Sequence, residues 1–114
     1  MGHDAHNIIV AGINEGDMKF ATDLIKKFQG GVVIVNKGTL ISSIKLPIAG
    51  LLSDKKASEV AIENRNFKKN WIEAGCNLAY MGFNLLSLSV IPNFRITNKG
   101  LVDVNSMKII PLFE

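Results

Sequence analysis

Residues 14–38 carry a helix signal, a stop and a strand signal in direct succession, and this order constrains the fold more than any other feature. Asn14 can cap a helix, with Glu15 and Asp17 in its first turn. The apolar positions that recur at helical spacing are Met18, Ala21, Leu24, Ile25 and Phe28. Gly30 and Gly31 stop this helix, and the β-branched run at residues 32–35 then predicts a strand buried on both faces.

The Asn-Lys-Gly signal at residues 36–38 predicts a hairpin turn, so residues 39–46 should return antiparallel. Before the helix, the apolar residues 8–13 predict a short buried strand. A strand, a helix and a strand in this order predict a crossover unit with residues 8–13 parallel to residues 32–35.

Residues 46–54 (LPIAGLLSD) match neither a helix nor a strand and predict an apolar loop, with Ser53 or Asp54 capping the next helix. That second helix should begin at Lys55 or Lys56, end at Ala74 and be stopped by Gly75. Its predicted buried side consists of Ala57, Val60, Ala61, Phe67 and Trp71.

The last third of the chain predicts strands. Residues 85–91 form an apolar element, a strand with a helical start as the alternative, and a second Asn-Lys-Gly at 98–100 joins alternating residues 94–97 and 101–104. Residues 107–113 predict an edge strand, because Pro111 cannot donate to a ladder. The sequence therefore predicts an α+β fold: a mixed β-sheet of about six strands with two main helices, in a single domain over residues 1–114.

Composition excludes several classes of protein. The charge of +3 comes from 13 basic and 10 acidic residues, and no basic run is interleaved with aromatic residues, which argues against nucleic-acid binding. A single cysteine, Cys76, excludes an internal disulfide framework and fits a reducing cytoplasm. Residues 74–94 lack charge, but polar residues and glycines interrupt them, so we expect a buried core segment rather than a membrane span.

The candidate site is the polar run His3, Asp4, His6 and Asn7 at the mouth of the first predicted strand. His3 and His6 lie on one side of a turn but on opposite faces of a strand, and a zinc-type site needs three or four ligands. A solvated chain start is the alternative interpretation. Met1 and Gly2 are typical of an artificial start, which predicts further native sequence upstream.

Other catalytic patterns are missing. Neither a phosphate-binding glycine loop before a helix nor a Gly-x-Ser-x-Gly motif occurs. Cys76 is expected to be a small buried hydrophobe rather than a nucleophile. The helical carboxylates Asp23, Glu59, Glu63 and Glu73 are predicted to face solvent.

Six segments, in order, resemble the C-terminal domain of adenine deaminases, metal-dependent purine deaminases of the amidohydrolase superfamily. They are HDAHNIIV at 3–10, GINEGDM at 12–18, LPIAGLLSD at 46–54, VIP at 90–92, GLVDV at 100–104 and PLF at 111–113. They are spread from residue 3 to residue 113, so the resemblance extends over nearly the whole chain.

The resemblance implies hydrolytic deamination of adenine to hypoxanthine and ammonia, in purine salvage or catabolism. Such chemistry uses a metal-activated water and an acid that protonates the departing nitrogen. In this superfamily the divalent metal, manganese or iron, is bound mainly by a (β/α)8 barrel of roughly 250 residues. This chain has neither that length nor a His-x-His pair, and one cysteine cannot supply a Pro-Cys-x-x-Cys zinc motif. We therefore expect one domain of a cytoplasmic enzyme, inactive alone, whose partner is the N-terminal barrel of the same polypeptide.

In that setting His3, Asp4, His6 and Asn7 would face the active site of the barrel, contacting adenine or supporting catalytic groups, and His3 and His6 could ligate an accessory metal. A polar network between domains is the competing hypothesis. An exposed apolar face at residues 46–52 is expected where the barrel docks, and it could pair two copies of the isolated chain. The alternative function is a free-standing α+β module that binds a ligand at the carboxyl ends of its strands.

Overall fold

The structure of the protein is a computed structural model that describes residues 7–77 and 93–113. Contacts within the chain divide it into two compact units. One unit is Val10–Tyr80, and the other combines Met1–Ile9 with Met81–Glu114.

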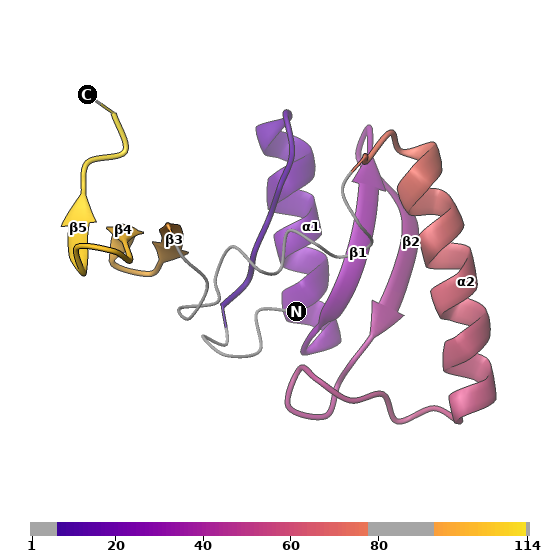
Figure 1. Cartoon of the computed structure of the whole chain (residues 1–114). Helices are drawn as coiled ribbons and strands as arrows, with labels where there is room; N and C mark the ends of the chain where they lie inside the picture. The colour runs from indigo at the N-terminus through magenta and orange to yellow at the C-terminus, as the bar shows by residue number, and fades with distance from the viewer. Residues whose placement is uncertain (1–6, 78–92, 114) are drawn as a thin grey trace. The chain divides into compact units, whose positions relative to one another are not determined.

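The larger unit contains two helices and a hairpin. Helix α1 (Glu15–Phe28) leads into strands β1 (Gly31–Asn36) and β2 (Thr39–Lys45), and helix α2 (Ala57–Glu73) follows. The two strands pair antiparallel, as the turn signal predicted. Figure 1 shows the hairpin between the helices, with α1 beside β1 and α2 beside β2.

Helix α1 forms where local signals predicted it. The side chain of Asn14 caps it by accepting a hydrogen bond from the Asp17 amide at 2.9 Å. At the other end Gln29 adopts the left-handed conformation (φ 61°), and the Gly30 amide donates to the Ile25 carbonyl at 3.1 Å. This arrangement satisfies carbonyl groups that a helix end otherwise leaves unpaired.

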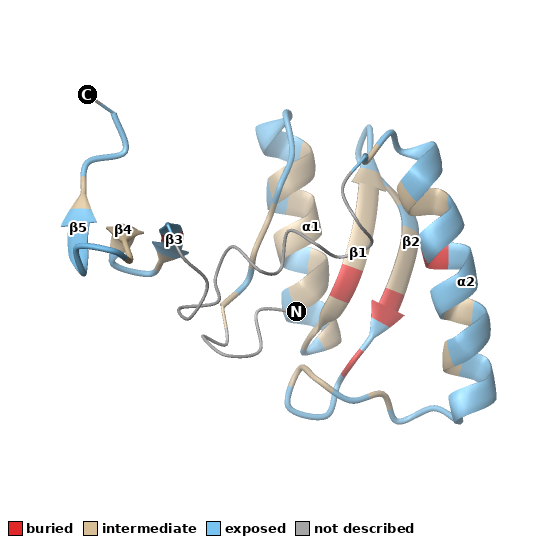
Figure 2. Cartoon of the chain, viewed as in Figure 1, coloured by how far each residue is buried: buried red, intermediate tan, exposed pale blue. Residues whose placement is uncertain are grey.

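The core of this unit is small. Its buried apolar side chains are Val32, Ile44, Leu46 and Phe67, and Figure 2 shows buried residues on β1, β2 and α2. Val32 and Ile44 are direct partners across the hairpin, so they point to the same face. The ring of Phe67, only 1% exposed, lies 6.4 Å from the ring of Trp71, centroid to centroid.

Helix α2 differs from its prediction at the start and along its buried side. It begins at Ala57 after Lys56, and neither Ser53 nor Asp54 caps it, because the backbone still turns through those residues. Val60, Phe67 and Trp71 are at least half-buried as predicted, but Ala57 and Ala61 are exposed. Glu63 is half-buried, which contradicts its prediction as a solvent-facing carboxylate.

The other unit holds a three-stranded antiparallel sheet in the order β3-β4-β5. Its strands are β3 (Phe94–Thr97), β4 (Gly100–Asp103) and β5 (Lys108–Ile110). The second hairpin and the edge position of the last strand are confirmed, although β5 is shorter than predicted because it stops before Pro111. Ile96, Leu101 and Ile110 are register partners and form an apolar row on one face.

The prediction of a crossover unit is wrong. Residues 8–13 form no strand, and within the described part of the chain β1 pairs only with β2. The adjacent hairpin turn gives β1 an antiparallel neighbour without a long connection, Ile13 is fully exposed, and Asn14 is committed to capping α1. The α+β class and the two main helices are confirmed, and the described residues hold five strands where about six were predicted. These strands form two antiparallel sheets and not the one mixed sheet that was predicted.

Among residues 7–77 and 93–113, no helix is both long and apolar enough to cross a bilayer. The predicted apolar element at 85–91, and most of the uncharged stretch at 74–94, lie outside the described residues.

Candidate functional site

The predicted polar run is only partly within the described residues. His3, Asp4 and His6 lie outside them, and Asn7 is half-buried in an isolated bridge. The hypothesis that these side chains face an active site therefore stays a prediction.

The described residues do not supply a metal site of their own. Nowhere in 7–77 and 93–113 do three histidine, cysteine or carboxylate side chains cluster in a way that could hold an ion. Cys76, which was predicted to be a small buried hydrophobe, is a free cysteine just after α2 and is only half-buried. The donor set of the described residues therefore does not fit a catalytic metal.

We call residues 47–52 the apolar loop. Leu46, the residue that joins this loop to β2, is held in place. Leu46 is buried, and its amide donates to the Gly30 carbonyl at 3.1 Å. Within the loop, the amides of Ile48 and Leu52 each donate to the carbonyl of the other at 3.1 Å. Ala49 and Gly50 between them both have positive φ, 55° and 73°. The loop is thus a closed turn with a defined backbone.

Backbone packing against the end of α1 holds the apolar loop further. A Cβ atom added at Gly30 would lie 2.3 Å from the Gly50 Cα and 2.9 Å from the Leu46 carbonyl oxygen. Real Cβ atoms do not come so close, so only glycine permits this approach. The sequence marked Gly30 as a helix stop but did not show that Gly50 lies against it.

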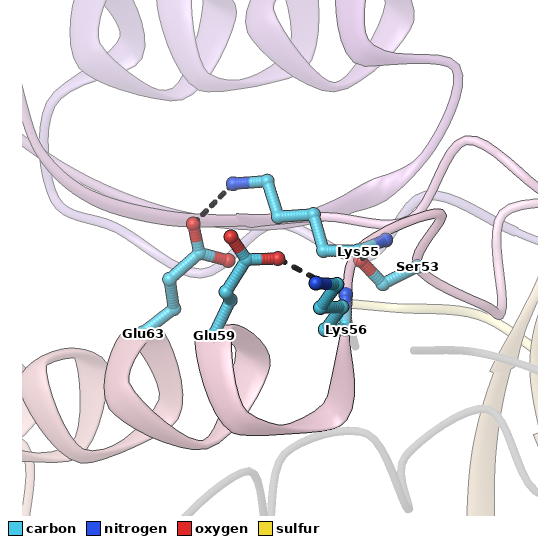
Figure 3. A network of polar contacts seen from close by, with 5 residues as sticks. All are labelled: Ser53, Lys55, Lys56, Glu59 and Glu63. Atoms are coloured by element: carbon cyan, nitrogen blue, oxygen red, sulfur yellow. Dashed lines mark hydrogen bonds and ion pairs between the residues drawn. The ribbon is translucent and has the colours of Figure 1, made fainter.

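Polar contacts hold the chain where it leaves the apolar loop and enters α2 (Figure 3). Ser53 Oγ accepts from the Lys55 amide at 3.1 Å, and Glu59 accepts from the Lys56 amide at 3.1 Å. The Lys55 ammonium forms an ion pair with Glu63, whose hydrogen bond raises the pKa of Lys55. Glu63 Oε2 is buried and has no hydrogen-bond partner among the described residues.

These anchors leave an apolar surface open. Ile48 is 49% exposed and Leu52 is 63% exposed, and Pro47 and Ala49 are exposed between the anchors. The predicted exposed face at residues 46–52 is confirmed for these side chains and wrong for Leu46, which belongs to the core.

Asp17 joins α1 to the tip of the first hairpin, a role that the sequence did not reveal. Its carboxylate accepts from the Lys37 amide at 2.9 Å and from the Gly38 amide at 2.7 Å. The local pattern explained Asp17 as a first-turn carboxylate, and nothing local points 20 residues ahead.

Comparison with known proteins assigns the family. The family model of the adenine deaminase C-terminal domain matches residues 1–108. The chain belongs to this family. Over 114 residues it is 57% identical to an adenine deaminase of Chelativorans sp. and 58% identical to adenine deaminase 3 of Rhizobium johnstonii. It is 46% identical to an adenine deaminase of Thermosipho africanus.

Length separates this adenine deaminase C-terminal domain from its relatives. The alignments cover 99–100% of this chain but only 19–20% of the three relatives, so the chain spans about a fifth of their length. No solved structure matches the chain.

Proposed function

We propose that this domain works as part of an adenine deaminase, in which a longer polypeptide converts adenine and water to hypoxanthine and ammonia in purine salvage or catabolism. The observation that carries the proposal is the 57% identity over the whole chain to one fifth of a protein named adenine deaminase. A domain that supplies a fifth of an enzyme is expected to be inactive alone.

We also propose where the metal is bound and where in the cell the enzyme works. The divalent metal, manganese or iron, would activate water in the barrel that precedes this domain, because the described residues hold no donor cluster of their own. We place the enzyme in the cytoplasm, where the lone Cys76 would stay reduced. A homo-oligomer remains a prediction.

The alternative of a free-standing ligand-binding module has less support. It placed a ligand at the carboxyl ends of strands in a crossover unit, and residues 8–13 do not form the parallel strand of that unit. Relatives that are five times longer also favour a domain over an independent protein.

A chimera tests the function. This chain replaces the matching fifth of the Chelativorans adenine deaminase, and ammonia release from adenine is measured with manganese or iron supplied. We expect turnover from the chimera and none from the 114-residue chain alone with either metal. Deamination by the chain alone, or a chimera that folds and binds metal but is inactive, contradicts the proposal.

The role of the polar run is tested in the same chimera. If His3 and His6 face the active site, His3→Ala and His6→Ala lower kcat at saturating metal, while the control Lys26→Ala, on the exposed last turn of α1, does not. A loss of bound metal would assign an accessory ligand role. Unchanged turnover and metal content would leave only the polar network between domains.

A further inference from the structure

The apolar loop combines exposed apolar side chains with a backbone that is held at both ends. Its entry is fixed by the buried Leu46 and by the approach of Gly50 to Gly30. Its exit is fixed by the contacts of Lys55 and Lys56 with Glu63 and Glu59. A loop already ordered in the free state loses little conformational entropy on binding, which favours association.

The side chains of the loop also offer only apolar contact. Residues 47–52 carry no charged or polar side chain, and the nearest charges along the chain are Lys45 and Asp54. Exposed Ile48 and Leu52 flank the Ala49-Gly50 turn, where the small residues leave both side chains accessible. A complementary surface must therefore be an apolar recess.

We infer that the apolar loop is the surface through which this domain docks onto the preceding four-fifths of its own polypeptide. This inference rests on the proposed function, since it requires that the domain works within a longer adenine deaminase. It adds which residues make the contact and what chemistry receives them.

The size of the loop favours a tethered occupant over a second copy of the chain. A stable complex between separate proteins uses about 20–30 residues on each side, and the loop has six. A partner on the same polypeptide is present at an effective concentration in the millimolar range, so a much smaller contact keeps it docked. The share of the relatives that lies outside this chain, about 80%, supplies such a partner.

Hydrogen exchange tests the docking surface. The amides of residues 48–52, which follow Pro47 in the loop, are followed in the 114-residue chain and in the chimera described above. Docking in more than nine-tenths of molecules slows exchange in the chimera by about tenfold or more. The slowing should not depend on protein concentration, because the contact is within one polypeptide.

Matched variants make the test specific. The double variant Ile48→Ser with Leu52→Ser should restore fast exchange in the chimera, and it should not lower the unfolding midpoint of the isolated chain, since both side chains are exposed. The control Ile62→Ser with Ile72→Ser changes isoleucines on α2 that are equally exposed, 52% and 63%, and should keep the slow exchange.

Several results overturn the inference. These are equal exchange in chimera and isolated chain, slowing that grows with concentration and so marks a second copy, or slowing that survives the loop variant. Adenine turnover separates the two hypotheses. A chimera that deaminates without slowed exchange removes only the docking surface, whereas slowed exchange without deamination removes only the proposed function.

Discussion

The same three residues, Asn-Lys-Gly, close the β1–β2 hairpin and the β3–β4 hairpin, yet they do so in different registers. In the first hairpin Asn36 pairs with Thr39, so Lys37 and Gly38 form the turn, both with positive φ. In the second hairpin Thr97 pairs with Gly100, so Asn98 and Lys99 form the turn, and neither has a positive φ. One short signal therefore specifies a reversal of the chain but not its register.

The two turns also differ in the side chains that hold them. The first turn donates two backbone hydrogen bonds to Asp17 on α1. The second is held by its own Thr97, whose hydroxyl donates to the Gly100 carbonyl and accepts from the Lys99 amide. The first turn is held by a side chain of a helix, and the second turn by a side chain of its own hairpin.

The two hairpins also differ in how deeply their side chains are buried. The first hairpin lies between two helices and contributes Val32 and Ile44 to the core. In the three-stranded sheet Phe94 and Ile96 remain more than half exposed. The difference teaches that similar hairpins gain stability from what covers them, and four experiments test this, from the largest expected effect to the smallest.

Phe67→Ala removes the most deeply buried side chain of the larger unit, and we expect a loss of about 3–5 kcal/mol in the free energy of unfolding. Ile96→Ala changes a side chain of the three-stranded sheet that is 57% exposed, and it should cost under about 1 kcal/mol because it removes little buried apolar area. Urea unfolding of the 114-residue chain measures both. Equal losses would break the comparison.

Gly30→Ala forces a methyl group against the backbone of the apolar loop and should cost about 2–4 kcal/mol, from overpacking and a strained positive φ. Gly38→Ala is the matched control: its φ is also positive, at 70°, but nothing lies within 4 Å of the added Cβ. Its cost should be about 1 kcal/mol, measured by the same urea unfolding. A Gly30 variant as mild as the control would show that the loop moves freely.

Asp17→Ala unties the first turn from α1, and loss of two hydrogen bonds to a charged group should cost about 1.5–3 kcal/mol. Thr97→Val in the second turn should cost less, about 0.5–1.5 kcal/mol, because its bonds are neutral. Thermal unfolding compares the two. If the Thr97 variant loses more, the turn held by the helix is not the stronger one.

Ser106→Ala tests whether a hydrogen bond beside the three-stranded sheet changes how stability depends on pH. The Ser106 hydroxyl, and then the amides of Asn105 and Ser106, hold the pKa of Asp103 below its usual 3.8 against the opposing effect of burial. Since the folded pKa is the lower one, this contribution is present above pH 3.8 and is lost as pH falls through the folded value. The variant should raise the pKa of Asp103 and flatten the acid loss of stability, which NMR titration and unfolding at several pH values measure. An unmoved pKa would show that Ser106 does not set it.

Part of the candidate site could be predicted from the sequence and part could not. The exposure of Ile48 and Leu52 was predicted, because residues 46–54 match neither a helix nor a strand and the family resemblance implied a docking face at residues 46–52. The contacts that hold the loop in place could not be predicted from the sequence. Glu63 was expected in solvent, and its contact with Lys55 spans eight residues between a loop and a helix. The sequence resemblance correctly indicated the family, which folding geometry alone did not reveal.

The sequence by itself determined the elements whose hydrogen bonds close within a few residues: the Asn14 cap, the end of α1 at Gln29 and Gly30, and the reversals at both Asn-Lys-Gly turns. Only the tertiary structure decided that residues 8–13 stay out of the sheet, that Asp17 reaches Gly38, and that Gly30 meets Gly50. Local bonds depend on neighbouring residues alone. Contacts over some twenty residues depend on which surfaces the whole fold brings together, and no short pattern encodes that.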